Sequence, residues 1–287
     1  VDRYRKSTEF RDLSENSKRN YNPILSRIRE QWGSMPFDVI DDRSVRDGIT
    51  EKRDEIAARS RRQADYYVQV LSVVLAFGVQ IGKLHHNHAK GIGKVYFSDR
   101  SEKIWLPEHV AAFNSVAYGE LQFALLLGLH TGQREGDLIK LKWSAYDGTG
   151  IMLTPSKTQS KKKQQAGRTS YVPCTVALKA ALDSADRRSI FIMTSKSGQP
   201  WKQRHFQGEF AKVMERAGLK GELHFHDLRG TTVTMLSEAS ATVPEIAAIT
   251  GHTIKSVHTI LERYLARTKA LATAAIVKID KHKRVNK

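Results

Sequence analysis

Apolar residues recur at helical spacing over most of the chain, and this pattern limits the possible folds more than any other feature. Tyr21, Leu25, Ile28 and Trp32 fall on one face of a helix. Pro23 lies within that stretch and marks either its first turn or a kink. A second apolar stripe predicts a longer helix over about 60–81. We therefore expect the first third of the chain to be helical.

The period of the pattern changes once in the rest of the chain. Residues 151–154 and 169–172 predict two strands of a hairpin, and a polar, lysine-rich loop over 159–167 separates them. Helical periodicity surrounds this hairpin. The expected helices begin at Pro107, cover the apolar run 121–130, and then span about 175–182, 203–218, 226–238, 243–250, 256–264 and 269–280. The fold class expected is mostly α with a small antiparallel β-sheet (α+β).

A glycine- and serine-containing stretch interrupts the helical pattern between the two parts. It contains Gly91-Ile92-Gly93 and Ser98-Asp99-Arg100-Ser101, which predict a linker over 91–103. We expect a helical domain over 1–90 and a second domain over 104–287 that includes a tail helix. The chain starts at Val1 rather than Met, so we expect it to be a fragment.

The charge balance favours an acidic partner. Lys and Arg number 47 against 30 Asp and Glu, for a formal charge of +17. A charge this large opposes compaction, and a basic domain gains affinity for nucleic acid by releasing counterions from phosphates. The longest apolar run, 121–129, is too short to cross a bilayer, and no secretion signal is visible. Charge alone does not separate an enzyme from a histone-like binder.

Cysteine and histidine usage argues against a metal centre. The single cysteine, Cys174, excludes an intramolecular disulfide and follows the end of a predicted strand, where a packed, inert thiol is expected. His85, His86 and His88 lie close together, but no Cys or carboxylate stands at ligand spacing beside them. We interpret 83–90 as a polar loop and expect no metal.

Five short motifs follow one another through the second part. They are Thr131–Leu138 (TGQREGDL), Ser156-Lys157-Thr158 after an apolar strand, His226-Asp227-Leu228-Arg229, Gly251-His252, and Tyr264. Each one alone has an ordinary explanation. Arg134 could pair with Glu135 or Asp137 on the surface, Lys157 could be one loop lysine among several, and Tyr264 could be a half-buried aromatic residue. Their order and local context carry the argument.

Together the motifs resemble the boxes of the tyrosine recombinases, the phage integrase family, and lambda-type integrases in particular. By this resemblance Tyr264 is the nucleophile that attacks a DNA phosphate. The other catalytic residues implied are Arg134, Arg229 and His252 around the non-bridging oxygens, Lys157 as the acid for the leaving oxygen, and His226 in proton transfer, with Asp137 bracing Arg134. Guanidinium groups suit a phosphorane-like transition state because they donate in pairs.

The resemblance also implies partners and surroundings. The two domains would clamp double-stranded DNA, with a homotetramer forming on attachment sites and a DNA-bending accessory protein as a further partner. No cofactor is implied, because the phosphotyrosyl bond stores the energy of the broken strand. The resemblance also implies that the protein acts on DNA in the bacterial cytoplasm and that a phage or mobile element carries it. The DNA-contact residues expected are Arg59, Arg61, Arg62, Lys161, Lys162, Lys163 and Arg168.

Some alternatives stay open at this point. Tyr264 follows His252 by twelve positions, a few more than is usual in the family, yet no other tyrosine lies nearby. A type IB topoisomerase uses nearly the same residues without a partner strand, and a relic that only binds DNA would belong to a different class. The tail helix, with a stripe that includes Leu271 and Ile279, would dock either on its own domain or on a neighbouring protomer.

Overall fold

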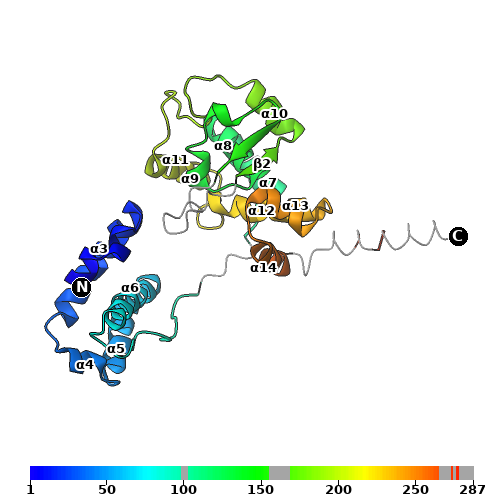
Figure 1. The fold of residues 1–287 in the computed structure, drawn as a ribbon. Helices are drawn as coiled ribbons and strands as arrows, with labels where there is room; N and C mark the ends of the chain where they lie inside the picture. The colour runs from blue at the N-terminus through cyan, green and yellow to red at the C-terminus, as the bar shows by residue number, and fades with distance from the viewer. Residues whose placement is uncertain (98–102, 155–168, 265–272, 274–275, 278–287) are drawn as a thin grey trace. The chain divides into compact units, whose positions relative to one another are not determined.

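The structure is a computed structural model, and it describes residues 1–97, 103–154, 169–264, 273 and 276–277; for residues 263 and 264 it describes the backbone alone. The chain divides into two compact units, Val1–Ser98 (unit 1) and Asp99–Lys287 (unit 2). Figure 1 shows their helices and strands in chain order. Helices dominate both units, and one two-stranded sheet belongs to unit 2, so the expected fold class is confirmed.

Unit 1 is built from helices. Its elements are α1 (Asp2–Lys6), α2 (Thr8–Arg11), α3 (Glu15–Trp32), α4 (Phe37–Asp41), α5 (Val45–Ala57) and α6 (Arg61–Gln80). The predicted long helix is α6, and the Ser60 hydroxyl accepts a hydrogen bond from the Gln63 N–H at its start. Pro23 does not lie in a first turn, because α3 begins at Glu15 and continues through it.

One buried hydrogen bond joins the two longest helices of unit 1. The indole Nε1–H of Trp32, at the end of α3, donates to the Tyr67 hydroxyl on α6 at 2.8 Å. Both side chains belong to the apolar core of the unit, together with Leu25, Ile49 and Leu71. A buried indole N–H requires such a partner, so this contact sets how α3 and α6 lie on each other.

The residues after α6 are attached to unit 1 by side chains. Arg46 donates to the carbonyls of His88, Lys90 and Gly91 at 2.9, 2.9 and 3.0 Å. Asp65 accepts the backbone N–H groups of Val95 and Tyr96. Residues 83–90 form an irregular loop that ends in a turn at 88–90, as expected. The first part of the predicted linker therefore packs on unit 1.

Unit 2 surrounds its hairpin with helices. In chain order it contains α7 (Pro107–Val116), α8 (Gly119–Thr131), α9 (Glu135–Leu138), η1 (Trp143–Ala145), β1 (Gly150–Leu153), β2 (Ser170–Pro173), α10 (Val176–Asp183), α11 (Gln203–Arg216), η3 (Phe225–Asp227), α12 (Leu228–Glu238), α13 (Val243–Thr250) and α14 (Ile254–Tyr264). The strands pair antiparallel, with Gly150 opposite Pro173 and Leu153 opposite Ser170. The predicted hairpin is confirmed.

The core of unit 2 holds α8 against α12. A Cβ on Gly128 would lie 2.8 Å from Leu228 Cδ1 and 2.9 Å from Phe225 Cζ, so glycine allows the two segments to approach closely. The Thr232 hydroxyl, one turn into α12, donates to the Leu129 carbonyl at 2.8 Å. Residues 226–238 do not form one α-helix as predicted, because His226 lies in the 3₁₀ turn η3 that precedes α12.

Gly132 ends α8 in the left-handed conformation, with φ at +61°. A Cβ there would also lie 3.0 Å from Thr232 Cβ on α12. The position therefore requires glycine twice, once for its backbone conformation and once for the close approach of α12.

We predict that Gly132→Ala destabilises unit 2 more than Gly218→Ala does. Both glycines have positive φ, which costs a residue with a Cβ roughly 1–2 kcal/mol, but Gly218 has open space around it. The contact with Thr232 should add about 1–3 kcal/mol of overpacking. Urea unfolding followed by tryptophan fluorescence measures the difference, since three of the four tryptophans lie in unit 2. Equal losses for the two variants would contradict the close approach.

Candidate functional site

Arg229 stands in the first turn of α12 with only 5% of its surface exposed. Its Nη1 donates to the Gly132 carbonyl at 2.5 Å, and its Nε donates to His252 Nε2 at 3.0 Å. The first bond places the cation at the C-terminal end of α8, where the helix dipole favours positive charge. One guanidinium thus joins the ends of two other segments.

His252 is oriented by a short chain of hydrogen bonds. It follows Gly251, which ends α13 in the left-handed conformation. The Thr250 hydroxyl donates to the Ile246 carbonyl at 2.7 Å, so it is left to accept from His252 Nδ1 at 2.8 Å. The ring proton therefore lies on Nδ1, and Nε2 offers its lone pair to Arg229.

The electrostatic surroundings keep His252 neutral. Burial lowers its pKa to about 3, and the positive charges of Arg229 and Arg134 lower it in the same direction. Neutral His252 is consistent with its role as the acceptor of the Arg229 N–H.

Arg134 lies at the start of α9, immediately after the turn that ends α8. Its Nη1 lies 4.0 Å from Asp137 Oδ2, and the two side chains are 28% and 7% exposed. The adjacent Gln133 is buried and donates to the Ile249 carbonyl at 2.8 Å, which ties this turn to α13. The structure thus places Arg134 and Asp137 side by side, as the sequence predicts.

Two guanidinium nitrogens in this region are buried and make no hydrogen bond with any described residue: Arg134 Nη1 and Arg229 Nη2. Burial lowers the pKa of Arg229 to about 10, and the charge of Arg134 lowers it further. Buried N–H donors ordinarily have partners. Two cations close enough to repel, each with a buried nitrogen that makes no hydrogen bond with a described residue, form a site that an anion with several oxygens would complete.

The remaining predicted catalytic residues are placed only in part. His226 is exposed in η3, directly before α12, and its charge contributes to the low pKa of His252. Tyr264 is the last residue of α14, and its side chain lies outside the described residues. Lys157 also lies outside them. The structure therefore brings together Arg134, Arg229 and His252.

The residues predicted to contact DNA divide in the same way. Arg59, Arg61 and Arg62 are exposed around the start of α6, whose first turn contains no acidic residue. Lys161, Lys162, Lys163 and Arg168 lie outside the described residues. Arg61 and Arg62 lie at the positive end of the α6 dipole, where cations do not stabilise the helix, whereas Arg59 follows the C-terminal end of α5.

Several residues that hold the site were not singled out by the sequence. Gln133 and Thr250 anchor the two turns, although both stand beside motif residues. The Glu135 carboxylate accepts from the side chains of Gln203 and Gln207 on α11 at 3.2 and 2.8 Å. Burial raises the pKa of Glu135. The pairing of Arg134 with Glu135 considered from the sequence is not what holds this carboxylate.

Comparison with known proteins gives the family. The model of the phage integrase family matches residues 108–270, which is more than half of the chain. The chain belongs to the phage integrase family. The integrase of Escherichia phage lambda is 24% identical over 163 residues, which span 56% of this chain and 45% of that protein. The match thus covers less than half of this relative's length.

Solved structures show the same fold over nearly the whole chain. A lambda integrase dimer bound to a COC′ core site superposes with a TM-score of 0.77 at 20% identity, over 93% of this chain and 96% of that one. The Tn1549 transposon integrase in complex with transposon right end DNA gives a TM-score of 0.72 at 15% identity, over 93% and 95%. A lambda integrase tetramer bound to a Holliday junction gives 0.73 at 21% identity, over 89% and 75%. In the part of the chain that the structure describes, no helix has the length and apolar character needed to span a membrane.

We predict that His252 stays neutral in the DNA-free protein from pH 8 to well below its ordinary pKa of about 6.5. Its folded pKa of about 3 lies below the unfolded value, so the unfolded state binds the extra proton. Folding stability should fall as the pH drops through the window between these two values. Nitrogen-15 NMR of the histidine rings, with His252→Gln to assign the signal, measures the titration. A His252 ring that titrates near 6.5 would contradict the hydrogen-bond arrangement.

Proposed function

We propose that this chain is a site-specific DNA recombinase that cuts and rejoins DNA through a 3′-phosphotyrosyl intermediate. One observation carries the proposal: Arg134 Nη1 and Arg229 Nη2 are buried and make no hydrogen bond with any described residue, beside a neutral His252. Membership of the phage integrase family supports the same chemistry. Family membership also favours recombination over relaxation by a type IB topoisomerase. A relic that only binds DNA would not need the buried pair of arginines, so the pair argues against that alternative.

The proposed reaction has two balanced steps. The Tyr264 hydroxyl oxygen attacks the scissile phosphorus, a phosphotyrosyl bond forms, and the bond to the 5′ oxygen breaks. His226 receives the tyrosine proton and Lys157 supplies the proton for the leaving 5′ oxygen. In the second step the 5′-hydroxyl oxygen of a partner strand attacks the phosphotyrosyl phosphorus, and the bond to the Tyr264 oxygen breaks. The two proton transfers then run in the opposite direction. Bond energy is conserved throughout, so the reaction requires no nucleotide cofactor.

The arginine pair would stabilise the transition state. A phosphate seated between Arg134 and Arg229 supplies acceptors for their buried donors. The same anion favours the protonated form of the nearby His252, so its pKa should rise when DNA binds. A protonated Nε2 can no longer accept from Arg229 Nε, so both groups would donate to the phosphate. Asp137 Oδ2 lies 4.0 Å from Arg134 Nη1 and would help to orient the guanidinium.

The substrate and assembly follow from the family and the charge. The formal charge of +17 and the exposed arginines around the start of α6 suit double-stranded DNA. We infer that residues 1–90 form a core-binding domain, that a homotetramer assembles on attachment sites, and that a phage or other mobile element carries the protein in a bacterial cytoplasm. A DNA-bending accessory protein would assist the assembly. The lambda dimer, the lambda tetramer and the Tn1549 complex are the relatives that support this inference.

Covalent trapping tests the nucleophile and the arginine pair together. Nicked suicide duplexes with a randomised central region should give an SDS-resistant complex with the wild-type chain and none with Tyr264→Phe. Arg134→Ala should slow trapping by about 10²–10³, as loss of one transition-state donor does. Sequencing the trapped DNA would begin to define the site.

The outcomes separate the alternatives. Trapping of Tyr264→Phe at the wild-type rate would refute the assignment of the nucleophile. Binding without trapping by any variant would favour a DNA-binding protein. Relaxation of single plasmids by a monomer, without pairing of two sites, would favour a topoisomerase.

We predict that the three arginines around the start of α6 bind phosphates. Replacing Arg59, Arg61 and Arg62 with glutamine should weaken DNA binding to a similar extent across sequences. The slope of log K against log salt should become shallower by about 0.9 for each phosphate that the variant no longer neutralises. Filter binding over a salt series measures the slope.

A matched variant removes the same charge elsewhere in unit 1. Arg3, Arg11 and Arg43 are exposed and lie outside the start of α6. Their replacement with glutamine should leave the salt slope close to the wild-type value. Equal changes in the two triple variants would mean that net charge, rather than this helix start, determines binding.

A further inference from the structure

A carboxylate in unit 1 is held in place by three donors. Asp41 is the last residue of α4, and its Oδ1 accepts the backbone N–H groups of His85 and His86 at 2.8 Å each. The His85 ring donates from Nδ1 to Oδ2 at 2.5 Å. The Asp41 side chain is only 16% exposed. Its orientation is therefore set before any ligand arrives.

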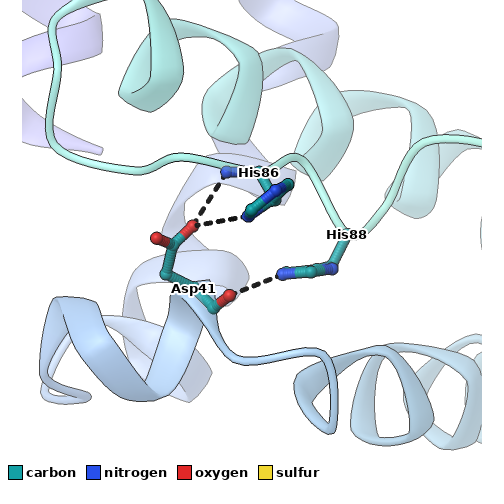
Figure 2. A group of neighbouring side chains, drawn as sticks. All are labelled: Asp41, His86 and His88. Atoms are coloured by element: carbon teal, nitrogen blue, oxygen red, sulfur yellow. Dashed lines mark hydrogen bonds and ion pairs between the residues drawn. The ribbon is translucent and has the colours of Figure 1, made fainter.

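Two imidazoles stand beside this carboxylate. His86 Nδ1 lies 3.9 Å from Asp41 Oδ1, and the His86 and His88 rings lie 5.6 Å apart. His88 turns Nε2 towards Asp41 and donates from it to the Asp41 backbone carbonyl at 2.7 Å. Figure 2 shows the three side chains meeting between the end of α4 and the loop after α6.

The spacing is close to that of a metal site. One ligand atom from each of Asp41, His86 and His88 can be chosen so that all lie within 4.8 Å of one another. Zinc ligands at about 2.0–2.2 Å in a tetrahedral arrangement lie about 3.4 Å apart. The atoms must close by up to about 1.4 Å. The His86 ring can supply part of this movement because 71% of the side chain is exposed. The fixed member of the group is the carboxylate.

We propose that unit 1 binds a divalent transition-metal ion, with Zn²⁺ as the best fit, through Asp41, His86 and His88. Two imidazoles and one carboxylate suit zinc, copper or nickel rather than calcium or magnesium. Three protein ligands leave the fourth position to water. His85 would keep the carboxylate oriented, as hydrogen-bonded neighbours of metal ligands commonly do.

Metal binding requires one rearrangement. An imidazole ligates through a lone pair, so His88 Nε2 must release its hydrogen bond to the Asp41 carbonyl and carry its proton on Nδ1 instead. The bound ion would then join α4 to the loop after α6, which are about 45 residues apart in the chain. The same loop begins the segment that Arg46 holds on unit 1. The ion would therefore stabilise the folded form of this unit by mass action.

Calorimetric titration of the full chain with zinc chloride, in a buffer that does not chelate metals, tests the site. We expect saturable binding of one ion per chain that is abolished or weakened about 100-fold or more in the His86→Ala, His88→Ala double variant. His205→Ala and His258→Ala remove exposed histidines of unit 2 and should change nothing. Paramagnetic Co²⁺ should broaden the amide signals around residues 41 and 85–88.

The Asp41→Asn variant gives a second test that does not depend on the folding of the double variant. The amide oxygen can still accept the two backbone N–H groups, whereas the anionic ligand is removed. Circular dichroism without metal should match the wild type, and zinc affinity should fall. Absence of saturable binding, or binding unchanged in both the double variant and Asp41→Asn, would overturn the proposal.

Discussion

The buried guanidinium of Arg229 is the group on which the arrangement of unit 2 depends. An arginine in the protein interior is costly unless its donors are used. Here Nη1 reaches the Gly132 carbonyl and Nε reaches His252, so two of its donors join segments that are remote in sequence. The third guanidinium nitrogen, Nη2, makes no hydrogen bond with a described residue. The interaction that organises the fold therefore leaves one buried position for an anion.

Two glycines end the helices whose C-terminal turns contact Arg229. Gly132 ends α8 and Gly251 ends α13, each in the left-handed conformation with φ near +61° and +66°. Each turns the chain so that the following residues face the start of α12 instead of continuing the helix. Gln133 then ties the first turn to the carbonyl of Ile249, next to the second. The two turns are thus coupled directly as well as through the arginine.

Unit 1 shows a different use of a fixed charge. Asp41 is surrounded by N–H donors, and these hold the loop after α6 against the end of α4. Burial opposes ionisation of Asp41, but the hydrogen bonds from His86 and His85 outweigh it and lower the pKa of the carboxyl to about 2. Both units therefore rely on an ionised side chain that collects donors or acceptors from distant segments. In unit 2 one nitrogen of the ionised side chain, Arg229 Nη2, makes no hydrogen bond with a described residue, so it is available to bind an anion.

The sequence by itself determined the elements and the order of the motifs. Helix starts at Ser60 and Pro107, the hairpin and the buried helix α8 follow from periodicities and caps that act within a few residues. Family membership followed from five motifs in order, and it is confirmed. The 3₁₀ turn at His226 was missed, because packing overrides local preference at such a place. Of the two alternatives for Pro23, the first turn is excluded because the helix continues through it.

Only the tertiary structure decided which groups meet. Arg229 and Gly132 are 97 residues apart, and no local pattern shows that the side chain of one satisfies the carbonyl of the other. The histidines after α6 had no carboxylate at ligand spacing in the sequence, yet Asp41 comes to them from α4. Periodicity reports which face of an element is buried, whereas partners are chosen by the donors and acceptors that burial leaves without water. That selection is made when the elements pack, so it could be observed only in the folded chain.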